Sequence, residues 1–216
     1  QKNLDEAHFL ERGYGVHHPD GTPLRLPEGW FKDALLMDFT HEEGRKWWFD
    51  KRRYLLELGV DGFKTDGGEM VWGQDLVFAD GSSGLEQRNR YPGDYISAYY
   101  QFAQANGGIT FSRAGYTGAQ TYPAHRAGDE RSTWDAFKRS MLAGLSAGMS
   151  GIIFWGWDMA GFSGEVPSAE LYVRSAQMAT FCPIMQYHAE SKAEFNQDRT
   201  PWNIAERSGD PRALTL

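Results

Sequence analysis

The chain has 216 residues, of which 41% are hydrophobic and 24% charged, as is ordinary for one globular domain or part of one. Its net charge of −7 comes without a Lys/Arg stripe, which argues against a nucleic-acid partner. No apolar run approaches the roughly 20 residues of a membrane span, and the first residues lack a signal-peptide pattern, so the sequence does not indicate a compartment.

Aromatic residues and a lone cysteine complete the composition. Aromatics make up 14% of the chain. Most are expected in a core, but several lie in Gly-rich stretches at expected strand ends, where their faces suit the apolar faces of sugar rings. Cys182 allows no internal disulfide, and its neighbours Phe181 and Pro183 predict a buried, inert thiol.

One pattern recurs along the chain: a helix, a Gly, a short β-rich run and a polar Gly-rich loop. In the first instance, the run 40–43 has the sequence of a capping box. In such a box the Thr40 hydroxyl accepts a hydrogen bond from the backbone N–H of Glu43, and the Glu43 carboxylate accepts one from the backbone N–H of Thr40. An amphipathic helix is expected from there to Leu58, stopped by Gly59. A strand over 60–65 and an exit loop over 66–69 follow.

Further elements are expected in chain order: a helix over 95–105, a strand over 109–112, a short strand over 122–125, a helix over 134–147, a strand over 152–155 and a helix over 168–180. Helices alternating with short apolar strands predict a parallel sheet covered on both faces. Such a sheet either stays open and doubly wound or closes as a (β/α)₈ barrel. No Gly-rich dinucleotide fingerprint opens a helix, and polar residues follow each strand, which favours the barrel.

The sequence therefore predicts a partial (β/α)₈ TIM barrel, comprising roughly strands four to seven of eight. Residues 1–216 are expected to be part of a single catalytic domain, with 1–37 a loop region after an earlier strand and 38–190 the core of the active-site half. A complete barrel needs about 250 residues, and a half barrel leaves two parallel edges unpaired. We expect the segment to need the remaining strands as a partner and to be inactive without them.

Two carboxylates stand at positions that could carry chemistry. Asp66 and Asp129 each directly follow an expected strand and lie in Gly-flanked loops. Parallel barrel strands deliver such residues to one rim, where a pair of carboxylates can cleave a glycosidic bond. From this pattern alone, an Asp after a strand is as readily explained as a helix cap.

Ordered motifs then resemble one family. Residues 59–69, GVDGFKTDGGE, are similar to the nucleophile segment of glycoside hydrolase family 31, the family of α-glucosidases and α-xylosidases. Other segments match this family in the right order: DFT at 38–40, SRAG at 112–115, PAHRAGD at 123–129, FWGWDMAGF at 154–162, and F-x-P at 181–183 with His188. The similarity covers roughly residues 36–190.

The resemblance implies roles for the matching residues. Asp66 is expected to be the nucleophile and Asp129 the acid/base. Lys64, two residues before Asp66 on the same strand face, can hold that carboxylate ionised. Asp158 is expected to position its neighbours or to serve as a structural hydrogen-bond acceptor. Substrate contacts are expected from Lys64, Arg113, Arg126, Trp155, Asp158, Phe162 and His188, with Glu69 and Trp157 in supporting positions.

Several residues depart from the family pattern. Arg126 stands where the family usually has a Trp that forms a wall of the sugar pocket, and it is expected either to face the pocket or to turn to solvent or Glu130. Gln186 replaces an Arg, and Met159-Ala160 replace Ile-Gly. Gly67 follows the nucleophile where α-xylosidases often carry Phe, which favours a sugar other than xylose.

The resemblance thus implies a retaining α-glycoside hydrolase that acts on an oligosaccharide or α-glycoside without a cofactor. A glucosyltransferase or an α-xylosidase of the same family is the alternative, and a catalytically inactive carbohydrate-binding barrel is the non-enzyme alternative. A metal site built from Asp66, Glu69, His125 and Asp129 is rejected, because these residues lack a compact ligand spacing.

Overall fold

The computed structural model describes residues 5–27, 29, 31–190 and 197–215. The chain divides into two compact units, a first unit of residues 1–122 and a second unit of residues 123–216. Among the described residues, no helix has both the length and the apolar composition required to cross a membrane.

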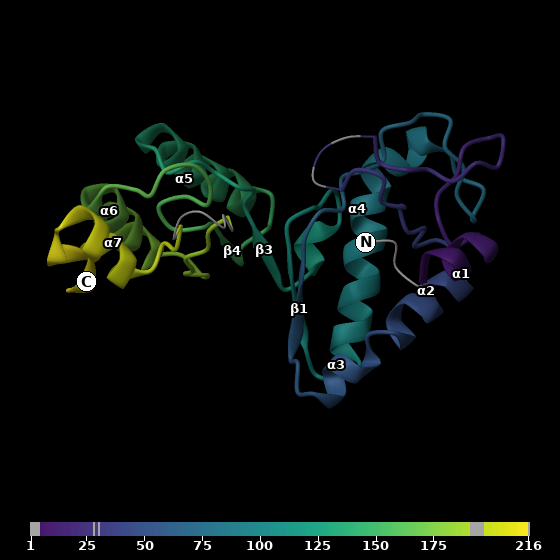
Figure 1. Ribbon diagram of the computed structural model, residues 1–216, viewed down its shortest axis with the longest axis horizontal. Helices are drawn as coiled ribbons and strands as arrows, with labels where there is room; N and C mark the ends of the chain where they lie inside the picture. The colour runs from purple at the N-terminus through teal and green to yellow at the C-terminus, as the bar shows by residue number, and fades with distance from the viewer. Residues whose placement is uncertain (1–4, 28, 30, 191–196, 216) are drawn as a thin grey trace. The chain divides into compact units, whose positions relative to one another are not determined.

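The first unit is built around two parallel strands joined by a long helix. Its elements are α1 (Asp5–Glu11), α2 (Glu42–Asp50), α3 (Arg53–Glu57), β1 (Gly62–Thr65), α4 (Gly84–Gln104), β2 (Ile109–Ser112) and the short 3₁₀ helix η1 (Ala119–Thr121). Strand β1 pairs with β2 in register from Gly62 opposite Ile109 to Thr65 opposite Ser112. Helix α4, which connects the two strands, runs beside β1 (Figure 1). This is a parallel β-α-β unit, as the sequence predicts.

The helices of the first unit differ from the prediction at several points. The single helix expected from the run 40–43 to Leu58 is divided into α2 and α3. The capping box expected at Thr40 is wrong, because the Thr40 hydroxyl donates to Asp38 at 2.7 Å. The N-cap of α2 is instead His41, whose Nδ1 accepts from the backbone N–H of Gly44. Helix α4 begins eleven residues before the predicted Tyr95, at Gly84. The expected loop region 1–37 also contains helix α1 within its described part.

An aromatic core stabilises the first unit. Phe39, Phe49, Tyr91 and Tyr99 are buried in one cluster, and Phe49 stacks on Phe102 with ring centroids 4.8 Å apart. At the carboxyl ends of β1 and β2, the buried Thr65 hydroxyl donates to Ser112 at 2.6 Å. This hydrogen bond joins the last residues of β1 and β2, after which Asp66 and Arg113 follow.

The second unit repeats the architecture. Its elements are β3 (Ala124–Arg126), α5 (Trp134–Met149), β4 (Trp155–Gly156), α6 (Ala169–Ala179), α7 (Pro201–Ser208) and the 3₁₀ helix η2 (Pro211–Leu214). Strand β3 pairs with β4 in parallel, with His125 opposite Trp155 and Arg126 opposite Gly156. The predicted strand over 152–155 lies mostly before the observed pairing, which begins at Trp155.

A second core lies among the helices of this unit. Trp157, Leu171, Tyr172 and Ile204 are buried together. Cys182, predicted to be buried, is half-buried beside this cluster, and desolvation raises the pKa of its thiol. A raised pKa disfavours the reactive thiolate.

Candidate active site

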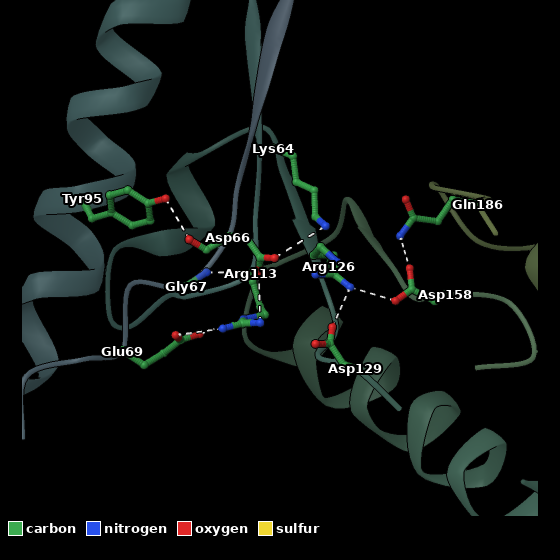
Figure 2. A network of polar contacts seen from close by, with 10 residues as sticks. All are labelled: Lys64, Asp66, Gly67, Glu69, Tyr95, Arg113, Arg126, Asp129, Asp158 and Gln186. Atoms are coloured by element: carbon green, nitrogen blue, oxygen red, sulfur yellow. Dashed lines mark hydrogen bonds and ion pairs between the residues drawn. The ribbon is translucent and has the colours of Figure 1, made fainter. Parts of the chain in front are cut away.

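Asp66 lies at the carboxyl end of β1 between two cations. Arg113 Nη1 is 3.0 Å from one carboxylate oxygen, and Lys64 Nζ is 3.7 Å from the other (Figure 2). Arg113 directly follows β2, so the register of the two parallel strands brings it to Asp66. Opposite charges at these distances favour the ionised carboxylate.

Glu69 holds Arg113 from the other side. The guanidinium donates from Nε and Nη2 to the two carboxylate oxygens of Glu69, at 3.0 and 3.2 Å. This paired geometry fixes the plane of the guanidinium while Nη1 remains directed at Asp66. We call Lys64, Asp66, Glu69 and Arg113 the Asp66 cluster; its four formal charges sum to zero.

The backbone of the exit loop is tightly constrained. Gly67 and Gly68 have φ of +75° and +99°, a region that L side chains rarely adopt. A Cβ on Gly68 would lie 2.7 Å from the Tyr95 ring and 3.0 Å from the Ala114 Cβ. Two successive left-handed residues turn the chain so that Glu69 reaches back to Arg113.

Tyr95 of α4 supports the same loop. Its hydroxyl donates to the backbone carbonyl of Asp66 at 2.9 Å (Figure 2). Burial, followed by the proximity of Tyr99 and the carboxylates of Asp66 and Glu69, raises the pKa of Tyr95. The phenol therefore remains protonated and able to donate across the ordinary pH range.

The second unit carries its own charged network. Arg126 Nη2 donates to Asp158 at 2.8 Å and to Asp129 at 3.2 Å, and Gln186 Nε2 donates to the other oxygen of Asp158 at 2.8 Å (Figure 2). The side chains of Arg126 and Asp158 are each 1% exposed, whereas that of Asp129 is 30% exposed. We call Arg126, Asp129, Asp158 and Gln186 the Arg126 cluster.

This network settles the orientation of two residues that the sequence left open. Arg126 is neither turned to solvent nor paired with Glu130, whose nearest described cation is Arg139 at 3.6 Å. Asp158 serves as a buried hydrogen-bond acceptor that also positions Arg126, so both expectations for it describe part of its contacts. Contact of Arg126 with a substrate stays a prediction.

The remaining candidates of the second unit divide into two groups. His188 is exposed and lies against the buried ring of Phe162, with centroids 5.0 Å apart. Trp155 instead packs on α5, where a Cβ on Gly144 would lie 2.6 Å from its ring. Trp157 is buried and stacks on Trp155. Trp155 thus packs against α5 and Trp157 lies in the core, and a substrate contact by Trp155 stays a prediction.

A cavity of about 960 Å³ in the first unit does not include the expected site residues. Trp47 and Trp48 line it, but the Lys51 ammonium lies 5.2 Å from the Trp47 ring and the Arg52 guanidinium 3.6 Å from the Trp48 ring. Its aromatic surfaces are thus already covered in part by cations, and none of the predicted catalytic residues lines it.

The sequence did not identify roles for Tyr95, Gly68 and Gln186. Tyr95 was expected only as the first residue of a helix, and nothing local to it indicates a bond to Asp66. Gln186 was noted as a replacement, without its partner Asp158. The double glycine after Asp66 is the one signal that could have been used, because consecutive Gly residues often mark left-handed backbone.

The two units are parallel β-α units with charged groups at the carboxyl ends of their strands. This is the arrangement of an α/β domain whose site lies at that end of the strands, as in (β/α)₈ barrels. Comparison with known proteins then gives the family. The model of the glycosyl hydrolases family 31 TIM-barrel domain matches residues 2–213, and the chain belongs to this family. The predicted fold and family are confirmed.

Three relatives are informative. The chain is 50% identical to a 1,3-alpha-isomaltosidase from Kribbella flavida, over 100% of its own length and 31% of that protein. It is 47% identical to an isomaltosyltransferase from Sporosarcina globispora, over 97% of its length and 20% of that protein. A solved structure of a cycloalternan-degrading enzyme from Trueperella pyogenes, in complex with a covalent intermediate, superposes with a TM-score of 0.93 at 50% identity, covering 97% of this chain and 29% of that one.

The chain spans between a fifth and a third of the length of these relatives. The comparisons therefore identify the domain to which the chain corresponds, and the activity of the whole protein is addressed below as a proposal.

Proposed function

We propose that the protein carrying this chain cleaves α-glucosidic bonds by a retaining double displacement, with Asp66 as nucleophile and Asp129 as acid/base. The observation that carries the proposal is the Asp66 carboxylate at the end of β1, within 3.0 Å of Arg113 and 3.7 Å of Lys64. Such a carboxylate remains ionised between turnovers and can attack without first losing a proton.

In the first step a carboxylate oxygen of Asp66 forms a bond to the anomeric carbon while the bond to the leaving oxygen breaks. Asp129 gives its proton to that oxygen. In the second step a water or sugar hydroxyl gives a proton to Asp129 and attacks the anomeric carbon, which releases Asp66 as a carboxylate. The covalent intermediate in the name of the Trueperella structure supports this scheme.

For the substrate, we propose an α-glucan from which an isomaltosyl unit is removed at an α-1,3 bond. The names of the 1,3-alpha-isomaltosidase and the isomaltosyltransferase support this choice. Their identities of 50% and 47% do not separate hydrolysis from transfer, so transfer to a sugar hydroxyl is the second candidate. Both share the first step and differ in the acceptor of the second.

The backbone at Gly67 disfavours the α-xylosidase alternative. Its φ of +75° strains any residue with a side chain, so the Phe that α-xylosidases often carry after the nucleophile fits poorly on this loop.

Trapping the intermediate tests the proposal. A fluorinated glycosyl donor that forms the glycosyl-enzyme but releases it slowly should label the peptide containing Asp66, as read by mass spectrometry. Asp66→Ala should abolish both labelling and turnover, and the first-formed product should retain the α configuration by NMR. Labelling of another residue, or an inverted product, would overturn the mechanism. Binding of oligosaccharide without any turnover would favour an inactive carbohydrate-binding barrel.

The carboxyl separation offers a structural test. In a substrate complex of the whole enzyme, Asp66 and Asp129 should lie about 5–5.5 Å apart, as in other retaining enzymes. A separation of about 9 Å with a water between them would instead indicate an inverting enzyme.

A further inference from the structure

The Arg126 cluster raises a question that the proposed function leaves open. Asp129 must hold a proton in order to deliver it to the leaving oxygen, yet a guanidinium nitrogen lies 3.2 Å from its carboxyl group. A guanidinium has only N–H donors, so this contact can orient an oxygen of Asp129 but cannot accept or hold the proton that Asp129 must deliver.

The same nitrogen has a closer partner. Arg126 Nη2 lies 2.8 Å from Asp158, against 3.2 Å from Asp129. Arg126 and Asp158 are both almost completely buried, whereas Asp129 is partly exposed. Coulomb attraction strengthens as distance and local dielectric fall, so the Arg126 charge is compensated mainly by Asp158.

Gln186 completes this arrangement. Its amide donates to the oxygen of Asp158 that Arg126 does not bind, at 2.8 Å. The backbone N–H of Met159 also donates to the backbone carbonyl of Gln186 at 3.0 Å. Two hydrogen bonds therefore join the segment that contains Asp158 to the segment that contains Gln186. Because the amide is neutral, Gln186 orients Asp158 without competing for its charge.

We propose that Asp158 and Gln186 are positioning residues that act through Arg126 to keep Asp129 competent as an acid. Asp158 neutralises the guanidinium, and Gln186 holds Asp158 in the geometry that makes this possible. Arg126 then aligns the Asp129 carboxyl group by a hydrogen bond while its charge is directed mainly at Asp158. This inference rests on the proposed function of Asp129.

Leaving-group dependence tests the proposal. An aryl α-glucoside with an activated phenol leaves without much protonation, whereas an oligosaccharide or an unactivated aryl glucoside needs the acid. In the whole enzyme, Asp158→Asn should leave the Arg126 charge directed at Asp129. The loss of kcat/KM should then be about 10–100-fold greater on the poor leaving group than on the good one.

Gln186→Met is the second variant, because it keeps every charge and most of the side-chain volume. It should show the same selectivity with a smaller ratio, about 3–10-fold. If Asp158→Asn does not fold, as judged by circular dichroism, Gln186→Met decides alone. Arg139→Met is the matched control: it removes an exposed Arg beside Glu130 in the same unit and should leave the ratio unchanged.

The outcomes separate the two proposals. Equal losses on both substrates for Asp158→Asn and Gln186→Met would indicate a purely structural role and overturn the inference. Asp129→Ala measured beside them tests the proposed function itself. If Asp129→Ala is selective for poor leaving groups and the two variants are not, the inference alone fails. If Asp129→Ala is not selective, the acid/base assignment fails first.

Discussion

The Asp66 cluster and the Arg126 cluster contain the same kinds of groups, carboxylates held by Arg, but differ in their exposure to water. In the first, the Asp66 and Lys64 side chains are 39% and 38% exposed. In the second, Arg126 and Asp158 are 1% exposed. Ion pairs in water contribute little to stability, whereas breaking a buried pair strands an uncompensated charge. We therefore expect substitutions in the Arg126 cluster to lower both stability and activity, and substitutions in the Asp66 cluster to lower activity with little effect on stability.

The largest expected effect tests the buried side of this comparison. Arg126→Met leaves Asp158 buried without its closest cation, and should lower the free energy of unfolding of the second unit by about 3–5 kcal/mol. Hydrogen exchange of the backbone amides of β3 and β4 in the whole protein measures it. Arg139→Met, which breaks an exposed pair, should change the same free energy by less than about 0.5 kcal/mol. Similar values for the two variants would refute the contrast.

The exposed Asp66 cluster is tested by measuring activity. Arg113→Met removes the cation nearest to Asp66, which Glu69 also holds in place, so kcat/KM should fall about 100-fold. Lys64→Met removes a cation at 3.7 Å, and its effect should be about 10-fold. Thermal unfolding of both variants should stay near that of the parent. A large loss of stability with either variant would show that exposure is a poor guide here.

The loop between Asp66 and Glu69 gives a matched pair of glycine variants. Gly68→Ala meets both a φ of +99° and contacts with Tyr95 and Ala114, and should destabilise the first unit by about 2–3 kcal/mol. Gly67→Ala meets a φ of +75° but no atom closer than 3.9 Å, so only the backbone cost of about 1 kcal/mol is expected. Urea unfolding of the two variants should rank them in this order, and the reverse order would contradict the steric argument.

Glu69 offers a finer test of the exposed cluster. Glu69→Gln keeps the shape but weakens the paired contact that fixes the Arg113 plane, so kcat/KM should fall about 10-fold with unfolding unchanged. Glu69→Asp, which keeps the charge on a shorter side chain, is the companion variant and should fall between the parent and Glu69→Gln. Full activity in Glu69→Gln would mean that Arg113 needs no such support.

The same contrast explains which features could be predicted from the sequence. Strand Ile109–Ser112 was predicted to the residue, because a short apolar run between a helix-ending Gly and a polar loop is local information. Asp66, Lys64 and Arg113 lie at or just beyond the ends of neighbouring strands, so the parallel register alone brings them together. The exposed cluster therefore follows from local pattern plus topology.

The buried cluster does not follow in that way. Arg126, Asp158 and Gln186 lie on three separate segments, and packing decides which polar groups meet once they are desolvated. The sequence showed Arg126 as a departure from the family pattern and an expected substrate contact, and Gln186 only as a departure. Their common partner, Asp158, became visible only in the folded unit.

Helix α4 shows a different reason for failure. Its predicted start at Tyr95 is wrong because the helix continues through Pro92, which reads as a helix breaker in the sequence. The true start is encoded locally by Ser83 and Glu86, which form the capping box that was sought at Thr40. At Thr40 the hydroxyl donates instead to Asp38, two residues earlier, and this local side-chain contact competes with the capping pattern.

The smallest expected effect concerns this cap, which lies on the helix that supports Asp66 through Tyr95. The backbone N–H of Ser83, and then its hydroxyl, donate to Glu86 and lower the pKa of that carboxyl group. A lowered pKa in the folded state means that Glu86 stabilises the fold above its unfolded pKa, and that this contribution is lost as pH falls through the folded value. Glu86→Gln should therefore unfold at a lower temperature than the parent at pH 7, and the difference should shrink below about pH 4, under the ordinary pKa range of Glu. Ser83→Ala, which removes the cap itself, should cost about 1 kcal/mol.

Thermal unfolding of the parent, Glu86→Gln and Ser83→Ala at pH 7 and below about pH 4 measures these shifts, and a Glu86→Gln difference that widens in acid would contradict the predicted sign. Because the cap is exposed and lies in the first turn of α4, turnover by all three proteins at pH 7 should be the same, as expected if the Asp66 cluster depends on Tyr95 and not on the beginning of its helix.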